Sequence, residues 1–193
     1  MKTIILDTES NGMKPEQVCQ LAYIVVNCGA VYARNFYFVV DTMNDYALKK
    51  HHLSKCRLHT LSNGRSFDER ITEFWSDLAT ADIIAGHNIS ADVRMLEVEL
   101  KRLNLELPKA KLFCTMKHYQ TAMHLRGRTG QRKPPRLEEL CRYFHVDELR
   151  VEKATKQLFG IRNAVAHDAR YDATATYLCI YEAQLRGDIK GVI

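Results

Sequence analysis

Four carboxylates and one histidine stand at three places in the chain where residue type and spacing could support chemistry. At the first place, Asp7 and Glu9 follow the aliphatic run "IIL" with one residue between them. Because side chains alternate along a strand, these two acids point to the same side, a few ångströms apart. Like charges held this close repel each other unless a cation lies between them. The alternative is a solvated strand end that runs into a turn at "ESNG".

The other two places carry Asp92 and the pair His167 and Asp172. Asp92 falls in the first turn of a predicted helix, after a short apolar strand, where an acid also suits the helix dipole. His167 is predicted in a loop, and Asp172 comes one turn into the last predicted helix, which Asp168 caps. Strand ends and helix starts of this kind form the ligand sites of α/β folds. Converging carboxylate oxygens would suit Mg²⁺ or Mn²⁺ better than zinc.

The elements that must position these residues predict a single α/β domain over residues 1–193, with a mixed sheet. The first three strands are β-branched and aromatic, and "NCGA" between the second and third is typical of a hairpin. Strands are predicted at residues 2–6, 18–26, 31–40, 82–86 and 111–114. Helices are predicted at residues 68–79, 90–103, 136–144 and 168–185. The polar residues 41–67 are expected to be irregular.

Composition excludes several classes of protein. The chain is 46% hydrophobic and has no apolar run of the ~18 residues that a membrane span needs. The start of the chain lacks the apolar core of a signal peptide, so a cytoplasmic location is expected. The six cysteines form no CxxC pair and read as reduced thiols. His52, Cys56 and His59 offer an alternative zinc site, although structural zinc usually takes four ligands with a paired knuckle.

A basic segment could contact phosphates. The formal net charge is +5, and residues 126–136, "RGRTGQRKPPR", carry five basic residues without an acid. Their glycines and prolines predict a mobile loop rather than a helix. The loop is interpreted either as a solvated surface or as a clamp on a nucleic-acid backbone. In the second interpretation, the residues that bind substrate are Arg126, Arg128, Arg132 and Lys133.

Taken together, the three places resemble the motifs of the DEDD 3′→5′ exonucleases. This family includes the proofreading subunit of bacterial DNA polymerase III, ribonuclease T and oligoribonuclease. Its D-x-E motif matches Asp7-Thr8-Glu9, and its second Asp, often preceded by His-Asn, matches Asp92 after His87-Asn88. Its H-x4-D motif matches His167 to Asp172, and position 168 holds Asp instead of the Tyr of the other branch. The resemblance spans nearly the whole chain and is to the His branch.

The resemblance implies an RNase H-like fold, with a five-stranded mixed sheet between helices, and two Mg²⁺ or Mn²⁺ ions. Asp7 would bridge the ions, Glu9 and Asp172 would hold the first, and Asp92 the second. His167 would accept the proton of the attacking water. The Thr8 backbone and Met13 would meet the terminal nucleotide, with His87 and Asn88 on the same edge. Nucleoside 5′-monophosphates would leave from the 3′ end of a single strand.

Substrate and partner are less constrained by the sequence. Single-stranded DNA, or a 3′ end, is the expected substrate, and trimming of RNA 3′ ends is the alternative within enzymes. A catalytically dead nucleic-acid-binding module on the same fold is a second alternative. A DNA polymerase is considered as a partner, but the chain stops soon after the last predicted helix. A stand-alone nuclease is therefore favoured.

Overall fold

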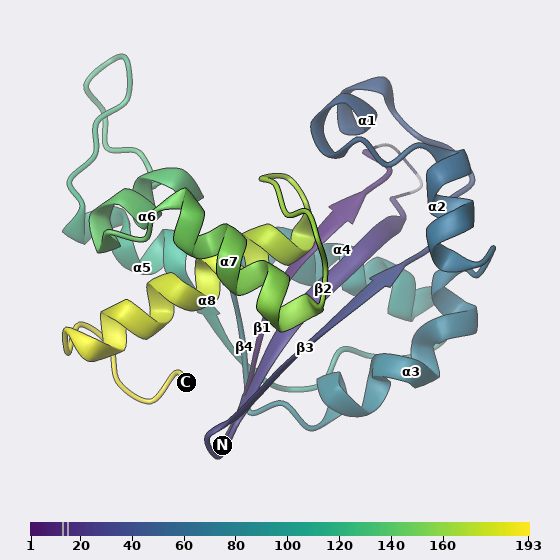
Figure 1. Ribbon diagram of the computed structural model, residues 1–193, viewed down its shortest axis with the longest axis horizontal. Helices are drawn as coiled ribbons and strands as arrows, with labels where there is room; N and C mark the ends of the chain where they lie inside the picture. The colour runs from purple at the N-terminus through teal and green to yellow at the C-terminus, as the bar shows by residue number, and fades with distance from the viewer. Residues whose placement is uncertain (13, 15) are drawn as a thin grey trace.

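A mixed five-stranded sheet forms the centre of the computed structural model, which describes residues 1–12, 14 and 16–193. Its spatial order is β3-β2-β1-β4-β5, so β1 is the central strand (Figure 1). β1 pairs antiparallel with β2 and parallel with β4, and β2 pairs antiparallel with β3. The strands are β1 Lys2–Ser10, β2 Val18–Asn27, β3 Ala30–Tyr37, β4 Ile83–Gly86 and β5 Lys111–Cys114. The predicted mixed five-stranded sheet, with its antiparallel start, is confirmed.

Helices cover both faces of this sheet. Figure 1 shows α7 and α8 crossing in front of the strands and α4 behind them. The helices between the third and fourth strands are α1 Asp45–His51, α2 Lys55–Ser62 and α3 Phe67–Ala79. The later helices are α4 Ile89–Arg102, α5 Thr115–Ala122, α6 Leu137–Phe144, α7 Glu148–Phe159 and α8 Ala169–Leu185. None of the helices in the described part of the chain is long and apolar enough to cross a membrane.

Strand alternation divides the core into two halves, one on each face. Ile4 and Leu6 of β1 pack with the apolar sides of α3 and α4. Ile5 points the other way, into the cluster formed by α6, α7 and α8. The odd-numbered residues that follow on β1, Asp7 and Glu9, share the face of Ile5. The pleat therefore directs both acids toward the side of the sheet that α8 covers.

The expectation that residues 41–67 are irregular is wrong. Two short helices occupy most of this segment, and a capping side chain starts each one. Asn44 Oδ1 accepts the N–H of Tyr46 at 2.8 Å, and Ser54 Oγ accepts that of Arg57 at 3.2 Å. Each helix ends on a residue in the left-handed conformation, His52 in α1 and Asn63 in α2. At seven and eight residues, both helices are too short for periodicity to reveal them.

Residues 125–133 fold back on themselves instead of forming an open loop. The N–H of Gly127 donates to the carbonyl of Gln131 at 2.8 Å, and that of Lys133 to the carbonyl of Leu125 at 3.1 Å. This basic hairpin projects from the body of the protein at the upper left of Figure 1. α5 and α7 also lie where no helix is predicted.

Candidate active site

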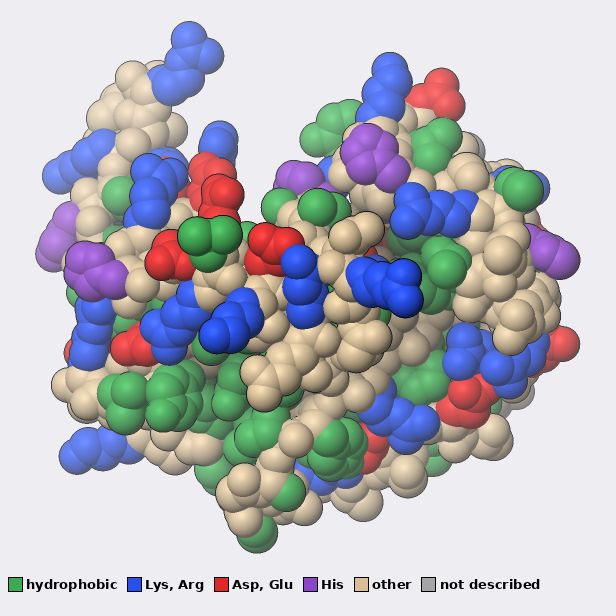
Figure 2. Space-filling model, viewed as in Figure 1, with side chains coloured by type: hydrophobic (Ala, Val, Ile, Leu, Met, Phe, Trp, Pro, Cys, Tyr) green, Lys and Arg blue, Asp and Glu red, His purple; other side chains and the backbone are tan. Residues whose placement is uncertain are grey.

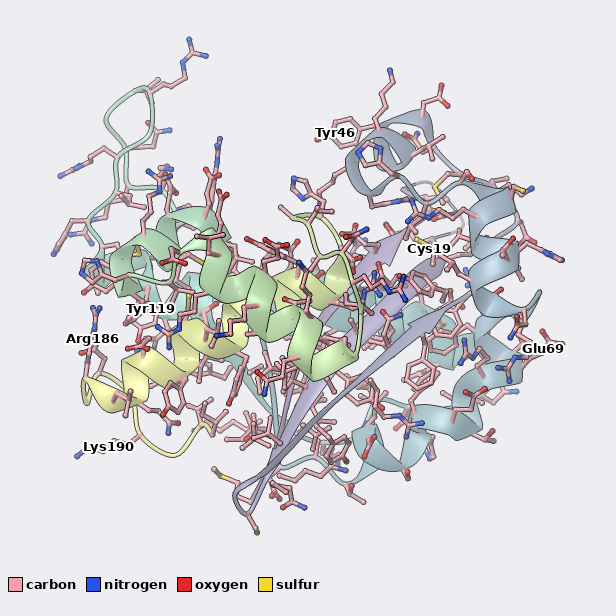
Figure 3. All side chains as sticks on the ribbon, viewed as in Figure 1. Cys19, Tyr46, Glu69, Tyr119, Arg186 and Lys190 are labelled. Atoms are coloured by element: carbon pink, nitrogen blue, oxygen red, sulfur yellow. The ribbon has the colours of Figure 1, made fainter. Side chains whose placement is uncertain are left out.

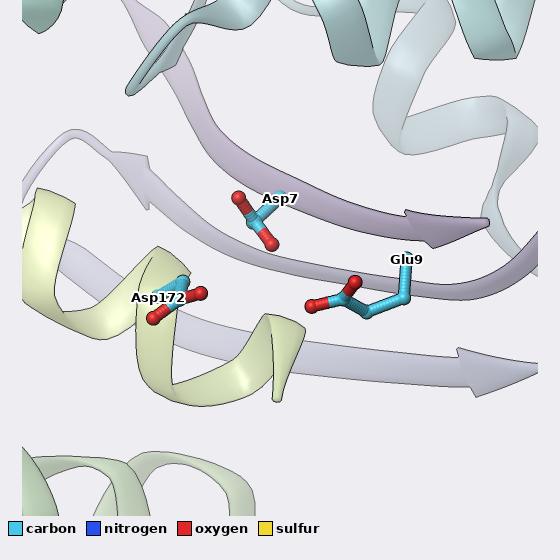
Figure 4. A group of neighbouring side chains, drawn as sticks. All are labelled: Asp7, Glu9 and Asp172. Atoms are coloured by element: carbon cyan, nitrogen blue, oxygen red, sulfur yellow. The ribbon is translucent and has the colours of Figure 1, made fainter. Parts of the chain in front are cut away.

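Three carboxylates from two elements meet at one point above the sheet. One oxygen from each of Asp7, Glu9 and Asp172 lies within 4.8 Å of the other two (Figure 4). The first two project from β1, and Asp172 projects from the first turn of α8. Asp168 starts that helix by accepting the N–H of Arg170 at 3.0 Å, which confirms its expected capping role. Such a cluster of hard oxygen donors fits a divalent cation such as Mg²⁺ or Mn²⁺.

Asp92 lies on α4, outside this group of three. Thr8 has the opposite pleat from its two acidic neighbours and faces α4. Its backbone N–H and its hydroxyl both donate to Asp92 Oδ1, at 2.9 and 2.7 Å. The sequence predicts that the Thr8 backbone meets the terminal nucleotide, but in the structure its N–H is used to hold Asp92. Thr8 is thus the residue that fixes the fourth acid beside the other three.

The four carboxylates are held close enough to resist ionisation together. Burial, followed by the negative charges of Asp92, Asp172 and Glu9, raises the pKa of Asp7 well above its ordinary value. Burial raises the pKa of Glu9 to about 8 and those of Asp92 and Asp172 to about 6. These shifts place Asp92 in the electrostatic field of Asp7, although it lies outside the group of three. Bound cations would reverse them, because a positive charge stabilises the ionised form.

Lys50 is the charged residue that sequence reasoning missed. It lies near the end of α1 and is exposed. Burial is the largest influence on all four carboxylates, and the positive charge of Lys50 partly offsets its effect on their pKa values. Lys50 belongs to the segment expected to be irregular, and no pattern distinguishes it from its neighbour Lys49. Only the fold brings it to the site.

His167 lies at the mouth of the site, on the loop before α8. It is exposed and has a left-handed backbone, with φ of 62°. Burial and the nearby Lys50 lower the pKa of its imidazole below the ordinary value. His167 and Asp172 line a cleft of about 940 Å³, which is also lined by residues of α1, α6 and α7. Figure 2 shows the surface hollowed between the arm that ends in the basic hairpin and the arm that carries α1.

The residues predicted to bind substrate are distributed around this cleft rather than gathered in it. The imidazole nitrogens of His87 lie 3.0 Å from Thr115 Oγ1 and 3.0 Å from the carbonyl of Pro135. His87 therefore ties the end of the basic segment to β4. Asn88 is exposed and starts α4 from a left-handed backbone.

On the basic segment, Lys133 forms an ion pair with Glu139 of α6. Arg126, Arg128 and Arg132 are exposed on the basic hairpin. Arg136, at its base, is the basic residue of this segment among the described residues that line the cleft.

Two other predictions from the sequence concern Met13 as a substrate contact and an alternative zinc site. Met13 lies outside the described residues. His52, Cys56 and His59 lie at the end of α1 and along α2. Among the described residues, the side chains close enough to share an ion are the three carboxylates, and this alternative zinc set is not among them.

A family model and a solved structure each match most of this chain. The model of the RNase T family, described as "Exonuclease", matches residues 4–179. A solved structure, the metal-free form of the E. coli ExoI–ssDNA complex, superposes with a TM-score of 0.64 at 17% identity. That match covers 97% of this chain but 40% of the ExoI chain. Thermus thermophilus RuvC matches with a TM-score of 0.32 at 13% identity, covering 97% of both chains. A search of curated protein sequences gives no match.

Proposed function

Because this chain belongs to the RNase T family of exonucleases, as its DEDD 3′→5′ motifs predict, we propose that it removes nucleotides from single-stranded DNA. The proposed reaction needs divalent metal ions, proceeds from the 3′ end and releases nucleoside 5′-monophosphates. The observation that carries it is the group of Asp7, Glu9 and Asp172, the last of which lines the cleft. DNA is favoured because the E. coli ExoI structure with the same fold was solved with ssDNA. Trimming of RNA 3′ ends stays the alternative within enzymes.

Whether divalent metal ions fit this site can be judged from the side chains that would bind them. Three carboxylate oxygens within 4.8 Å offer hard ligands, and burial, the largest cause, raises the pKa values of these carboxyl groups, which a bound cation would lower again. Asp7, Glu9 and Asp172 would hold one ion, and Asp7 with Asp92 a second. Two such ions supply charge neutralisation at the phosphate, a more acidic attacking water and stabilisation of the leaving oxygen.

The chain's own residues position these ligands and move the proton. Thr8 fixes the carboxylate of Asp92, and the strand pleat fixes Asp7 and Glu9 on one face. His167, with its lowered pKa, is neutral near pH 7 and can accept the proton of the attacking water at its free imidazole nitrogen. Lys50 places a positive charge beside the carboxylates, where an anionic phosphate would also be attracted.

End-labelled oligonucleotides test this proposal directly. A DNA strand and an RNA strand of the same sequence, each labelled at the 5′ end, are incubated with Mg²⁺, with Mn²⁺ and with EDTA. We expect a ladder of shortened, still-labelled strands with metal and intact strands with EDTA, and faster shortening of DNA. The Asp7→Asn variant is the inactive control.

Three results would contradict parts of the proposal. Release of the 5′ label as a mononucleotide would show that hydrolysis starts at the 5′ end. Undiminished hydrolysis in EDTA would show that the reaction needs no metal ions. Binding without hydrolysis under every condition would make the protein a binding module.

A further inference from the structure

One wall of the cleft is not explained by the hydrolytic site. The cleft runs between α1 on one side and α6 and α7 on the other, and Tyr46 is the residue of α1 that lines it. Its exposed fraction, 79%, is the highest among the large hydrophobic side chains that the structure describes. Figure 3 shows the ring extending from α1 toward the gap between the two arms. An exposed aromatic ring at the edge of a cleft offers a flat apolar face on which a nucleic-acid base can stack.

The helix that carries Tyr46 is fastened directly to the end of β1. The N–H of Asn44 donates to the carbonyl of Asn11 at 2.9 Å, and the imidazole of the buried His51 lies 3.2 Å from the carbonyl of Ser10. Gly12 approaches this helix so closely that a Cβ there would lie 2.7 Å from Ala47 Cβ. These contacts begin one residue after Glu9. The backbone of α1 is therefore fastened to the end of the strand that carries Asp7 and Glu9.

The opposite wall carries charges of both signs, because Glu138, Asp147 and Glu148 line it together with two arginines. Arg136 and Arg142 of the α6 segment line the cleft, with side-chain exposures of 77% and 74%. The acid that each of them approaches is the exposed Glu138, at the long distances of 3.7 and 3.8 Å. Such surface pairs contribute little, so both guanidinium groups can turn to a phosphate. The cleft thus combines an exposed aromatic ring on one side, two weakly paired arginines on the other, and Asp172 of the acidic group.

This combination is the one by which proteins hold single strands, with bases stacked on aromatic rings and the backbone tracked by cations. We propose that Tyr46 is the stacking platform for a base close to the 3′ end of the bound strand, with the backbone on the side of Arg136 and Arg142. The inference rests on the proposed function and adds the contact that selects the substrate. A base stacked on Tyr46 has left its neighbour in the strand, which a base inside a duplex cannot do without unpairing. Tyr46 therefore favours single strands over duplexes.

DNA strands that each lack one base can show which base contacts Tyr46. A set of labelled DNA strands carries an abasic site at successive positions from the 3′ end, and binding is followed by fluorescence anisotropy with Mg²⁺. Asp7→Asn protein is used so that the strands stay intact. We expect one position at which the missing base weakens binding roughly 5-fold to 100-fold, the range of a stacked base. Adding Tyr46→Ala should weaken binding of the intact strand by the same factor and remove the dependence on that position.

Two matched variants separate stacking from other effects. Tyr46→Phe keeps the ring and should keep the positional dependence. Tyr181→Ala removes a tyrosine that is 43% exposed on α8, and binding should be unchanged. If all abasic strands bind alike, or if Tyr46→Ala keeps the dependence on position, the inference is wrong.

The proposed function is judged separately, from wild-type hydrolysis. If strands bind with the expected dependence on Tyr46 but are never shortened, the proposed exonuclease activity is wrong and the proposed stacking on Tyr46 is supported. Strands that are shortened equally well by wild type and Tyr46→Ala, at equal kcat/KM, would contradict the platform alone.

Discussion

Two buried acidic sites lie at opposite ends of β1, and the protein treats them differently. Near the start of the strand, Asp77 of α3 accepts hydrogen bonds from Lys2 at 2.8 Å, Tyr32 at 2.7 Å and Tyr23 at 2.9 Å. Burial raises the pKa of Asp77, but these hydrogen bonds outweigh it, and the pKa lies below its ordinary value. Near the end of the strand, three carboxylates share one point, and burial with mutual repulsion raises their pKa values.

The difference separates an acid whose partners the fold supplies from acids that we propose support a reaction. Asp77 has its countercharge and its hydrogen bonds supplied by the chain, so it is complete in the folded protein. For the carboxylates around Asp7, the positive charge of Lys50 only partly offsets the effect of burial. Perturbed carboxylates in a cleft are typical of functional sites, whereas satisfied buried ones are typical of cores.

The largest expected effect is on catalysis, at Asp7. Asp7→Asn keeps the shape of the side chain but removes the charge of a proposed bridging ligand. Metal ions supply several kcal/mol of transition-state stabilisation, so hydrolysis should fall by about 10³-fold or more. Without metal, the variant should melt at a higher temperature than wild type, because one source of repulsion is gone. Calorimetry in EDTA measures this, and a variant that unfolds there would show that Asp7 serves the fold.

The converse substitution, Asp77→Ala, should damage the fold and spare the chemistry. It leaves Lys2 and two tyrosine hydroxyls without their acceptor, and breaking a buried pair of this kind costs about 3 kcal/mol. Urea denaturation measures the loss. The rate per folded molecule, with metal present, should stay at the wild-type value. A stable but inactive Asp77→Ala protein would break the comparison.

A slightly smaller effect is expected at His167, which belongs to neither group. As the proposed general base, its loss in His167→Ala should slow hydrolysis by about 10²-fold. His167→Asn should be nearly as slow, because an amide cannot accept the proton. The imidazole has a lowered pKa, so the wild-type rate should fall only as the pH drops below the ordinary histidine value. Rates measured at saturating Mg²⁺ test this, and activity within a few-fold of wild type would remove the role given to His167.

The two acidic sites should also make stability depend on pH with opposite signs. Glu9, with a pKa of about 8, and Asp92 and Asp172, with pKa values of about 6, bind protons in the folded state that the unfolded chain has lost. Their contribution to stability is complete below the ordinary carboxylate pKa of about 4 and is lost as the pH rises toward 8. Asp77, whose pKa is lowered, contributes stability above its ordinary pKa that is lost as the pH falls.

Melting curves recorded with and without metal measure this difference. In EDTA, the melting temperature should fall by several degrees between pH 5 and pH 8. Saturating Mg²⁺ should abolish the fall, because its ligands must be ionised. The fall should be smaller in Asp7→Asn. Identical curves with and without Mg²⁺ would mean that the carboxylates do not bind the ion.

The smallest expected effect is at Lys50. Lys50→Gln removes the countercharge of the acidic cluster, and an exposed charge is worth about 0.2–1 kcal/mol, or roughly 1–3 °C in melting temperature for a domain of this size. The decrease should appear in EDTA at pH 7 and at low salt, where screening is weak. Lys49→Gln, its neighbour on α1, is the matched control and should not change the melting temperature. An equal decrease in both variants would assign the effect to the helix rather than to the site.

The sequence predicted most of this site because the relevant contacts are local. The alternation that places Asp7 and Glu9 on one face spans three residues, and the turn between Asp168 and Asp172 spans five. The position of Asp92 on a helix after β4 was also predictable, but its bond to Thr8 joins residues 84 apart and follows from the sheet order. Pairing of β1 with both β2 and β4 is what brings α4 to that side.

The segment that carries Lys50 and Tyr46 could not be interpreted in the same way. α1 is polar and only seven residues long, and it is stable because it packs on Gly12 and bonds to Asn11. The signals that could have revealed the two helices of this segment are their capping residues, Asn44 before α1 and Ser54 before α2. Caps alone are common in loops, so the helix needs its tertiary contacts to be recognised.

The distribution of the carboxylates along the chain has a consequence for the cell that makes this protein. β1 is synthesised first and α8 follows some 160 residues later, so Asp172 leaves the ribosome long after Asp7 and Glu9. At a typical ~5–20 residues per second, the nascent chain spends many seconds with two acids and no third. An unfinished or prematurely released chain therefore lacks the complete ligand set. The proposed activity therefore requires α8 to be synthesised and docked beside β1.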